Sequence, residues 1–159
     1  MSEDLHTRNI VRLMITSGEY ILIAKFKERN EDIYFLPGGG IEYNESLITA
    51  AHRELAEEIG ITENQIKFIE PVAAYEHSWD DKGQPIHEIS IVCRCEINDL
   101  SYDKEVLSRE PHLEFIWQRV DLLFTINFLP EDFRIYVPKW LKQESQKASF
   151  FASGITKLP

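Results

Sequence analysis

The chain has 159 residues, 43% of them hydrophobic and 28% charged, which fits one globular domain able to bury its own core. Its formal net charge of −10 argues against nucleic-acid or anionic-membrane partners, since these bind basic surfaces. No apolar run approaches the ~20 residues of a membrane span, and the acidic N-terminus does not resemble an export signal. We expect one domain over residues 1–145 and a C-terminal tail over 146–159.

The first part of the chain predicts a hairpin, a short strand and a glycine-rich loop. Residues 9–16 and 20–26 are β-rich runs separated by a short turn, which is typical of a hairpin. Residues 34–37 read as a short strand ended by proline. The three glycines at 38–40 permit backbone conformations that are closed to other residues.

The first helix is predicted from Ser46 to Ile59. Ser46 suits the N-cap position, and Gly60 is a natural C-terminal cap. Apolar residues at helical spacing predict the buried face of this helix: Ile48, Ala51, Leu55 and Ile59.

The end of the same helix carries three carboxylates on one side, those of Glu54, Glu57 and Glu58. Residues three and four apart are neighbours on a helix, so these like charges repel one another. They also lie at the negative end of the helix dipole, where anions are disfavoured. Arg53 alone does not neutralise the cluster, which therefore indicates a cation supplied from outside the chain.

The second part of the chain predicts more strands and a further helical segment. Strands are expected at about 66–77 and 86–97, around a turn, and at 113–120. Residues 130–143 are expected to be helical in part, with Pro138 interrupting or restarting the helix. The order of strands, helix, strands and helix favours an α+β fold over a regular βαβ repeat.

Two cysteines, Cys93 and Cys95, lie two apart in a strand and so point to the same face. No metal or redox partner is evident for them, so buried thiols are the favoured interpretation. Reduced cysteines and the absence of an export signal predict a cytoplasmic location. In the tail, the pair Phe150–Phe151 is expected to pack against the same domain.

Residues 39–61, "GGIEYNESLITAAHRELAEEIGI", resemble the Nudix box, the pattern G-x5-E-x7-R-E-U-x-E-E-x-G-U in which U is aliphatic. Its nine defined positions are filled by Gly39, Glu45, Arg53, Glu54, Leu55, Glu57, Glu58, Gly60 and Ile61. The resemblance implies the fold of that family, an α/β/α sandwich with a mixed β-sheet flanked by helices.

The resemblance also implies an activity, the hydrolysis of a pyrophosphate bond in a nucleoside diphosphate linked to another moiety. Divalent Mg²⁺ or Mn²⁺ would clamp the phosphate oxygens and activate water. Such hard ions take oxygen ligands. The family pattern makes Glu54, Glu57 and Glu58 the candidate metal ligands, Glu54 and Glu57 with catalytic roles, together with a backbone carbonyl that by position is that of Gly38.

Other positions of the box have supporting roles in the family. Arg53 orients a metal-binding glutamate and is counted with the catalytic residues. Glu45 supports the loop–helix unit, and Gly39 and Gly60 are structural positions. The alternative for the whole motif is an ordinary solvated helix face on which the glutamates occur by chance. The complete box disfavours that interpretation.

Residues outside the box are assigned by weaker signals. Relatives often draw a further base or metal ligand from another strand or loop; Glu114 fits that habit best and Glu110 second, although an ordinary surface glutamate fits equally well. Glu88 is a candidate neighbour of the metal or phosphate site.

Arg12 lies among apolar residues of the first strand, where an arginine needs a partner. It would meet substrate phosphate, as arginines at this place do in relatives, or form a plain salt bridge. Lys25 closes the second strand and could act in the same way. Aromatic residues could stack on a base, with core packing as the alternative for each: Tyr34, Phe35, Tyr75 and Trp79.

The leading substrate class is a small nucleotide: a nucleoside triphosphate, ADP-ribose or a nucleotide sugar. Many relatives are dimers, so a homodimer is possible. Two rival functions use the same scaffold. One is a non-catalytic sensor domain that binds a nucleotide metabolite, and the other is an isomerase, for which Cys93 or Cys95 would be the thiol candidate.

Overall fold

The computed structural model describes residues 6–27 and 30–143. The predicted tail (146–159) and its Phe150–Phe151 pair lie outside this part of the chain. Within the described residues, no helix is long and apolar enough to cross a membrane.

A mixed sheet forms the centre of the fold, with the order β3-β2-β1-β6-β5; β4 joins β1 and β7 joins β2. Among the strand pairs in the described part of the chain, β1–β6 is parallel and the others are antiparallel. The strands are β1 (Thr7–Ser17), β2 (Tyr20–Phe26), β3 (Tyr34–Phe35), β4 (Gly38–Gly40), β5 (Ile66–Asp81), β6 (Gln84–Ile97) and β7 (Leu113–Arg119).

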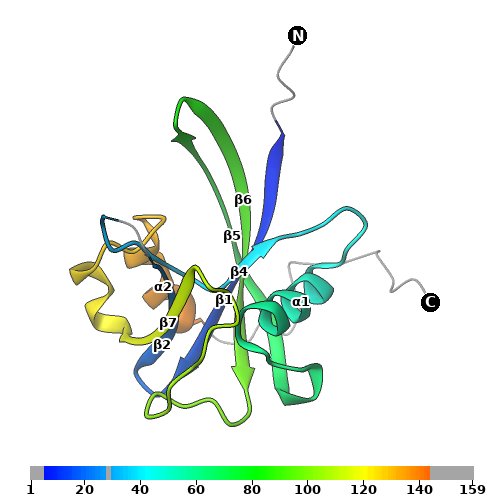
Figure 1. The fold of residues 1–159 in the computed structure, drawn as a ribbon, viewed down its shortest axis with the longest axis vertical. Helices are drawn as coiled ribbons and strands as arrows, with labels where there is room; N and C mark the ends of the chain where they lie inside the picture. The colour runs from blue at the N-terminus through cyan, green and yellow to red at the C-terminus, as the bar shows by residue number, and fades with distance from the viewer. Residues whose placement is uncertain (1–5, 28–29, 144–159) are drawn as a thin grey trace.

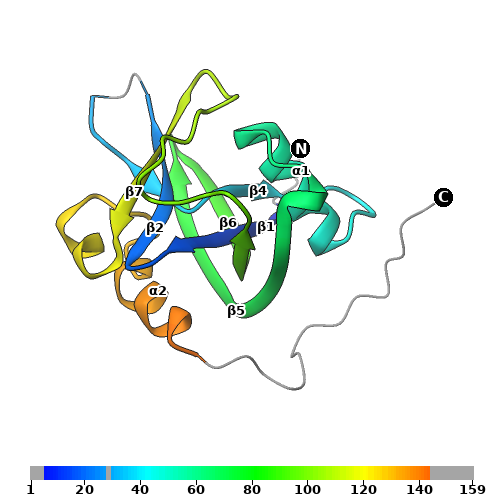
Figure 2. The ribbon, with the colours of Figure 1, turned by 90° about the horizontal axis from the view of Figure 1, so that it is seen from below.

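Helices cover the two sides of this sheet, α1 on one side and α2 with η2 on the other (Figures 1 and 2). An α+β fold with a mixed sheet flanked by helices is therefore confirmed. The helical elements are α1 (Leu47–Ile59), α2 (Phe133–Leu141) and the 3₁₀ helices η1 (Glu63–Gln65) and η2 (Val120–Thr125).

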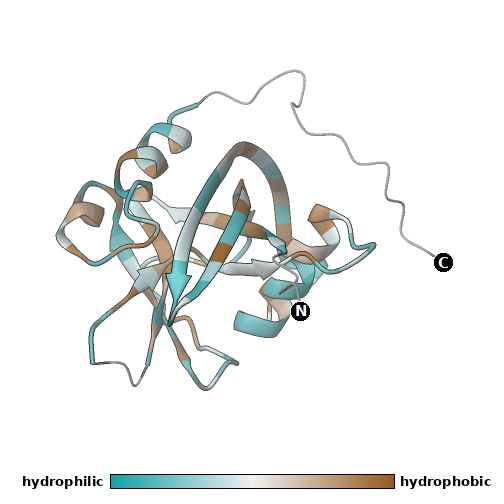
Figure 3. Ribbon diagram, turned by 90° about the horizontal axis from the view of Figure 1, so that it is seen from above, coloured by the Kyte–Doolittle hydropathy of each residue, from teal (hydrophilic) through white to brown (hydrophobic). Residues whose placement is uncertain are grey.

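Each side of the sheet has its own apolar core, because side chains alternate between the faces of a strand. On β1, Leu13 packs in the cluster that contains Leu55 of α1, whereas Met14 packs in the cluster that contains Phe133 of α2. Figure 3 shows hydrophobic and hydrophilic segments alternating along the strands. The position of a residue along its strand thus determines which helix it faces.

The predicted hairpin of β1 and β2 forms, but the two strands pair with each other only near their turn, at Thr16–Ile21 and Ser17–Tyr20. Beyond that point β1 pairs with β6 and β4, and β2 pairs with β7 and β3. Residues 34–40 link the diverging strands, because β3 lies along β2 and β4 lies along β1. This crossing brings the glycine segment against the first strand.

Helix α1 begins and ends as predicted. The Ser46 hydroxyl accepts a hydrogen bond from the Thr49 amide at 3.1 Å, and Gly60 adopts a left-handed conformation with φ of 71°. The predicted buried face is wrong in part, since Ile48 is 38% exposed. The face is rotated, and its buried members are Leu47, Ala50, Ala51, Leu55 and Glu58.

Two other expectations need correction. The strands β5 and β6 extend further than predicted and meet at a two-residue turn, Lys82–Gly83. Pro138 does not interrupt α2, which continues through it. A proline inside a helix removes one backbone hydrogen bond, and here the burial of Val137 and Trp140 on either side of it offsets that loss.

Candidate active site

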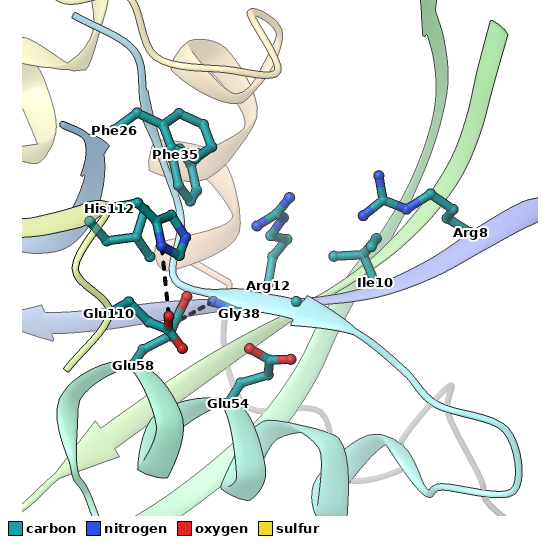
Figure 4. A pocket seen from close by; sticks show the side chains of 12 residues that line it. Arg8, Ile10, Arg12, Phe26, Phe35, Gly38, Glu54, Glu58, Glu110 and His112 are labelled. Carbon is teal, nitrogen blue, oxygen red and sulfur yellow. Dashed lines mark hydrogen bonds and ion pairs between the residues drawn. The ribbon is translucent and has the colours of Figure 1, made fainter. Parts of the chain in front are cut away.

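A cavity of about 280 Å³ lies where α1, the glycine segment, the start of β1 and the loop before β7 meet (Figure 4). Its lining is chemically divided. Carboxylates line one part, arginines another, and aromatic rings a third. The carboxylates are those of Glu54, Glu58 and Glu110, and the arginines are Arg8 and Arg12. The aromatic rings are those of Phe26, Phe35 and His112.

Glu58 is the most deeply buried of the box carboxylates, with 5% of its surface exposed. Its Oε2 accepts a hydrogen bond from the Gly38 amide at 3.1 Å. Among the described residues, no lysine, arginine or histidine forms an ion pair with it. Burial raises the pKa of Glu58 to about 8, with the Gly38 hydrogen bond acting in the opposite direction. The site therefore holds a carboxylate that lacks a cation of its own.

Arg53 ties the loop before α1 to the helix. Its Nε and Nη2 donate to the Glu45 carboxylate at 2.8 and 3.0 Å, and Nη2 also donates to the Gly40 carbonyl at 2.8 Å. Its Nη1 donates to Glu54 at 2.8 Å and to Glu57 at 3.2 Å. The hydrogen bonds from Arg53 lower the pKa of Glu45 below its usual value. Arg53 thus holds Glu45, Glu54 and Glu57 in place, and whether it orients them for a metal ion stays a prediction.

Glu54 and Glu57 differ in their surroundings. Burial raises the pKa of Glu54, although Arg53 opposes the shift, and its carboxylate lies on the cavity wall. The Glu57 side chain is 51% exposed and outside the cavity lining.

Two glycines of the loop, Gly38 and Gly39, lie close to neighbouring atoms, and Gly38 is required by a backbone contact. Gly38 has φ of 129°, and a Cβ there would collide with the Val11 carbonyl of the neighbouring strand. A Cβ at Gly39 would collide with the Glu54 carboxylate. The loop thus passes directly over the carboxylates of α1. Whether the Gly38 carbonyl binds metal stays a prediction.

Arg12 is nearly buried, with a side chain 17% exposed. Its Nη1 donates to the Leu36 carbonyl at 3.2 Å, and its Nη2 lies 3.8 Å from the Glu88 carboxylate. Burial lowers the pKa of Arg12, while Glu88 and Glu58 oppose that shift. Glu88 itself is 4% exposed and lies outside the cavity wall, behind the arginine.

Of the aromatic residues that line the cavity, only Phe35 was among the candidates from the sequence. Phe35 lines it, together with Phe26 at a ring-centroid distance of 4.6 Å, and the Arg12 guanidinium lies 5.7 Å from the Phe35 ring. The rings of Phe26 and His112 are 6.4 Å apart and nearly parallel. Phe26 and His112 carry no local signal in the sequence, because the pairing of β2 with β7 brings them together.

The other aromatic candidates lie elsewhere. Tyr34 contacts Lys25 and the second core, at 5.8 Å from the lysine nitrogen to the ring centroid. The Tyr75 hydroxyl donates to Asp132 at 2.7 Å, and Trp79 is 42% exposed near the tip of the β5–β6 hairpin. None of these three lines the cavity.

Glu110, the second-ranked acidic residue outside the box, lies on the cavity wall, and its carboxylate is 3.7 Å from His112 Nδ1. Glu114, ranked first, is exposed on β7 opposite Lys25 and outside the cavity lining. Lys25 forms an ion pair with Asp32 at 3.0 Å, and that hydrogen bond raises its pKa. The structure thus places Glu110, and neither Glu114 nor Lys25, next to the box carboxylates.

The donor set fits a divalent cation. Glu54, Glu58 and Glu110 present only carboxylate oxygens, the donors preferred by Mg²⁺ and Mn²⁺. Within residues 6–27 and 30–143 the side chains are not already gathered into a group of three or more that could hold a metal ion. The fit rests instead on the buried Glu58, whose ionised form needs a cation that the described residues do not pair with it.

The predicted burial of the two cysteines is confirmed. Cys93 and Cys95 are 0% and 3% exposed and carry free thiols. Burial raises the pKa of both thiols to about 12, so they stay protonated near neutral pH. Protonated thiols inside the core are poor nucleophiles, which argues against the isomerase alternative.

Comparison with known proteins agrees with this architecture. A family model of the NUDIX domain matches residues 6–140. An RNA pyrophosphohydrolase of Pelagibacter ubique is 28% identical over 151 residues, which cover 89% of this chain and 92% of the relative.

Solved structures share the fold at lower identity. The dihydroneopterin triphosphate pyrophosphohydrolase of E. coli superposes with a TM-score of 0.67 at 14% identity, covering 82% of this chain and 92% of the other. The mutator MutT protein of Bacillus halodurans gives a TM-score of 0.64 at 19% identity, covering 84% and 82%.

The chain belongs to the NUDIX family. Membership confirms the expected enzyme class, that of the Nudix pyrophosphohydrolases, which in general use divalent metal ions.

Proposed function

We propose that this chain is a Mg²⁺- or Mn²⁺-dependent enzyme that hydrolyses the pyrophosphate bond of a small nucleotide. The substrate class comprises nucleoside triphosphates, ADP-ribose and nucleotide sugars. One observation carries the proposal: a single cavity holds the buried, cation-deficient Glu58 on one side and Arg8 and Arg12 on another. This pairing suits a ligand that is itself anionic and is bridged to carboxylates by metal.

Glu54, Glu57 and Glu58 would hold the metal, which when bound neutralises phosphate charge and lowers the pKa of bound water. Arg53 fixes Glu54 and Glu57 through its two hydrogen bonds from Nη1. Glu57 lies outside the cavity lining and its side chain is 51% exposed, so in this proposal it would turn towards the metal when a cation competes with Arg53 for its oxygens. Arg12 would donate to substrate phosphate.

The proton acceptor for the attacking water is proposed to be a carboxylate at the cavity. Glu110 is better placed than Glu114 for this role or for an additional ligand, because it lines the cavity while Glu114 does not. The Nδ1 of its neighbour His112 lies 3.7 Å away, beyond a direct hydrogen bond, so a proton would pass from Glu110 to His112 through one bridging water.

The volume of the cavity, about 280 Å³, favours one nucleotide unit over a long polymer. The aromatic side formed by Phe26, Phe35 and His112 suits a flat base. A second candidate substrate is the 5′ end of an RNA, which presents the same triphosphate chemistry. The 28% identical RNA pyrophosphohydrolase favours it, whereas the net charge of −10 disfavours an extended RNA footprint.

The test is a substrate panel with Mg²⁺ or Mn²⁺, with products resolved by chromatography. It contains canonical and oxidised nucleoside triphosphates, ADP-ribose, nucleotide sugars, diadenosine polyphosphates and an oligoribonucleotide with a 5′-triphosphate. We expect one class to be cleaved and the Glu57→Gln variant to lose most of that activity.

If no compound is cleaved with either metal, but one raises the melting temperature, the protein is a sensor and the proposed catalysis is wrong. The cytoplasmic location and the homodimer remain predictions.

A further inference from the structure

A second buried carboxylate lies behind the arginines of the cavity. The Glu88 side chain on β6 is 6% exposed. Its oxygens lie 3.9 Å from Arg8 Nη1, 3.8 Å from Arg12 Nη2, 3.3 Å from His77 Nε2 and 3.4 Å from Ser90 Oγ. Glu88 does not line the cavity, so it reaches a bound substrate only through its neighbours.

Strand register explains this cluster. β1 and β6 run parallel with Arg8 opposite Glu88, and Arg12 lies four residues further along β1. Residues an even number apart share one face of a strand, so both arginines emerge on the same side of β1. Figure 4 shows this, with the guanidinium of Arg8 directed towards that of Arg12.

Two guanidinium groups that lie close together repel one another unless an anion lies near both. Glu88 supplies one negative charge for the two arginines, which leaves the pair with a net positive charge beside the cavity. Both arginine–glutamate distances exceed the 3.5 Å limit of a hydrogen bond, so these contacts are ion pairs. The N–H groups in these contacts can therefore still donate hydrogen bonds to a ligand. The one directed hydrogen bond of Arg12 in the described structure goes to the Leu36 carbonyl.

We propose that Glu88 is a positioning residue that holds Arg8 and Arg12 together as a binding site for a phosphate or pyrophosphate group of the substrate. The inference rests on the proposed function and adds to it a residue that never touches the ligand. A purely structural Glu88 would neutralise Arg12 in the core without affecting anion binding.

The probe for the test is methylenediphosphonate, a pyrophosphate analogue with a P–C–P bond that the enzyme cannot hydrolyse. Its binding is measured by calorimetry with Mg²⁺ present, for the wild type and Glu88→Gln. Because Glu88→Gln removes the charge that holds the two arginines, we expect its dissociation constant for methylenediphosphonate to be about tenfold higher than that of the wild type. On the best panel substrate, KM should rise by a similar factor, with kcat changed by less than about threefold.

Glu96→Gln is the matched control. Glu96 lies on the same strand and forms an ion pair with Lys67 at 2.7 Å, on the exposed surface and away from the cavity. Its substitution should leave both the dissociation constant and KM unchanged. If Glu88→Gln lowers the melting temperature but binds methylenediphosphonate like the wild type, Glu88 is structural and the proposal is overturned.

A double-mutant cycle tests the route through the arginines. In an Arg8→Gln/Arg12→Gln background, Glu88→Gln should weaken binding by less than about twofold, since the groups it positions are gone. A full tenfold loss in that background would mean that Glu88 acts on the ligand by another route, against the proposal.

Glu88→Asp keeps the test decisive if Glu88→Gln does not fold, because it retains the charge and only withdraws the carboxylate from the arginines. It should bind the probe about threefold more weakly; wild-type affinity would overturn the inference. Failure of the proposed function looks different. In that case no panel compound is hydrolysed, while binding of methylenediphosphonate still depends on Glu88.

Discussion

Two glutamates of this chain are buried to the same extent and yet have opposite surroundings. Glu58 on α1 is 5% exposed and Glu88 on β6 is 4% exposed. Glu88 has Arg8 and Arg12 within 4 Å. Among the described residues Glu58 has no such cation, and it accepts one backbone hydrogen bond, from Gly38.

The difference teaches how to separate a carboxylate that awaits a cation from solution from one that is paired with cations of the chain itself. A buried charge is costly unless it is paired, so a fold retains it only if a partner is present or arrives from solution. The chain supplies the partners of Glu88. For Glu58 it supplies a neighbouring Glu54 instead, which raises its pKa further. Glu58 is thus arranged for an external cation, and Glu88 for internal ones.

The largest predicted effect separates the two residues by kinetics. With Mg²⁺, Glu58→Gln should lower kcat about 10³-fold, because the metal it helps to hold contributes several kcal/mol to catalysis. Glu88→Gln should act mainly on KM. Steady-state kinetics on the best panel substrate make the comparison, with Glu96→Gln as the control. A Glu58→Gln enzyme within tenfold of the wild type would remove Glu58 from the metal site.

The second prediction uses protein treated with EDTA. The pKa of Glu58 is about 8 in the folded state against an ordinary 4.5, so between these pH values the folded state holds a proton that the unfolded state releases. Stability should therefore fall as pH rises from 4.5 to 8, by a few kcal/mol in total. Glu58→Gln, which stays neutral, should flatten this fall.

Glu88→Gln gives the contrast in the same urea titrations. It should destabilise the protein near neutral pH, because it leaves the buried Arg12 without its anion. If Glu58→Gln destabilises the metal-free protein as much as Glu88→Gln does, the two carboxylates do not differ in the way described.

These contrasts also show what the sequence could and could not predict. The Nudix box, the caps of α1 and the buried cysteines were predictable because each depends on residues close together in the chain. Arg53 and its glutamate partners follow from helical spacing in the same way. The buried face of α1 was misjudged, since Ile48 suggested an apolar stripe that the sheet does not meet.

The cavity as a whole could not be predicted. Phe26, Glu110 and His112 reach it only because β7 pairs with β2, a contact between segments far apart in the sequence. The choice between Glu110 and Glu114 depended on that pairing too. Glu114 lies on the strand with its side chain exposed, whereas Glu110 lies in the loop that covers the carboxylates.

The third prediction concerns the metal as a ligand of the folded state. At a concentration 100 times its dissociation constant, Mg²⁺ or Mn²⁺ should stabilise the wild type by about 2.7 kcal/mol. For a domain of this size that corresponds to a rise in melting temperature of about 5–10 °C. Differential scanning fluorimetry should show the shift in Glu88→Gln and not in Glu58→Gln. An equal shift in both variants would place the metal elsewhere.

The smallest predicted effect decides how far the carboxylate side of the cavity extends beyond the box. Glu110→Gln should lower kcat about tenfold, as expected for loss of a group that accepts a proton or supports the metal. Glu114→Gln should change it by less than about twofold, because Glu114 is exposed and lies outside the cavity. Both are measured at saturating substrate and metal. The reverse result would assign the supporting role to Glu114, and would mean that the cavity lining does not identify the acidic residue that acts beside the box.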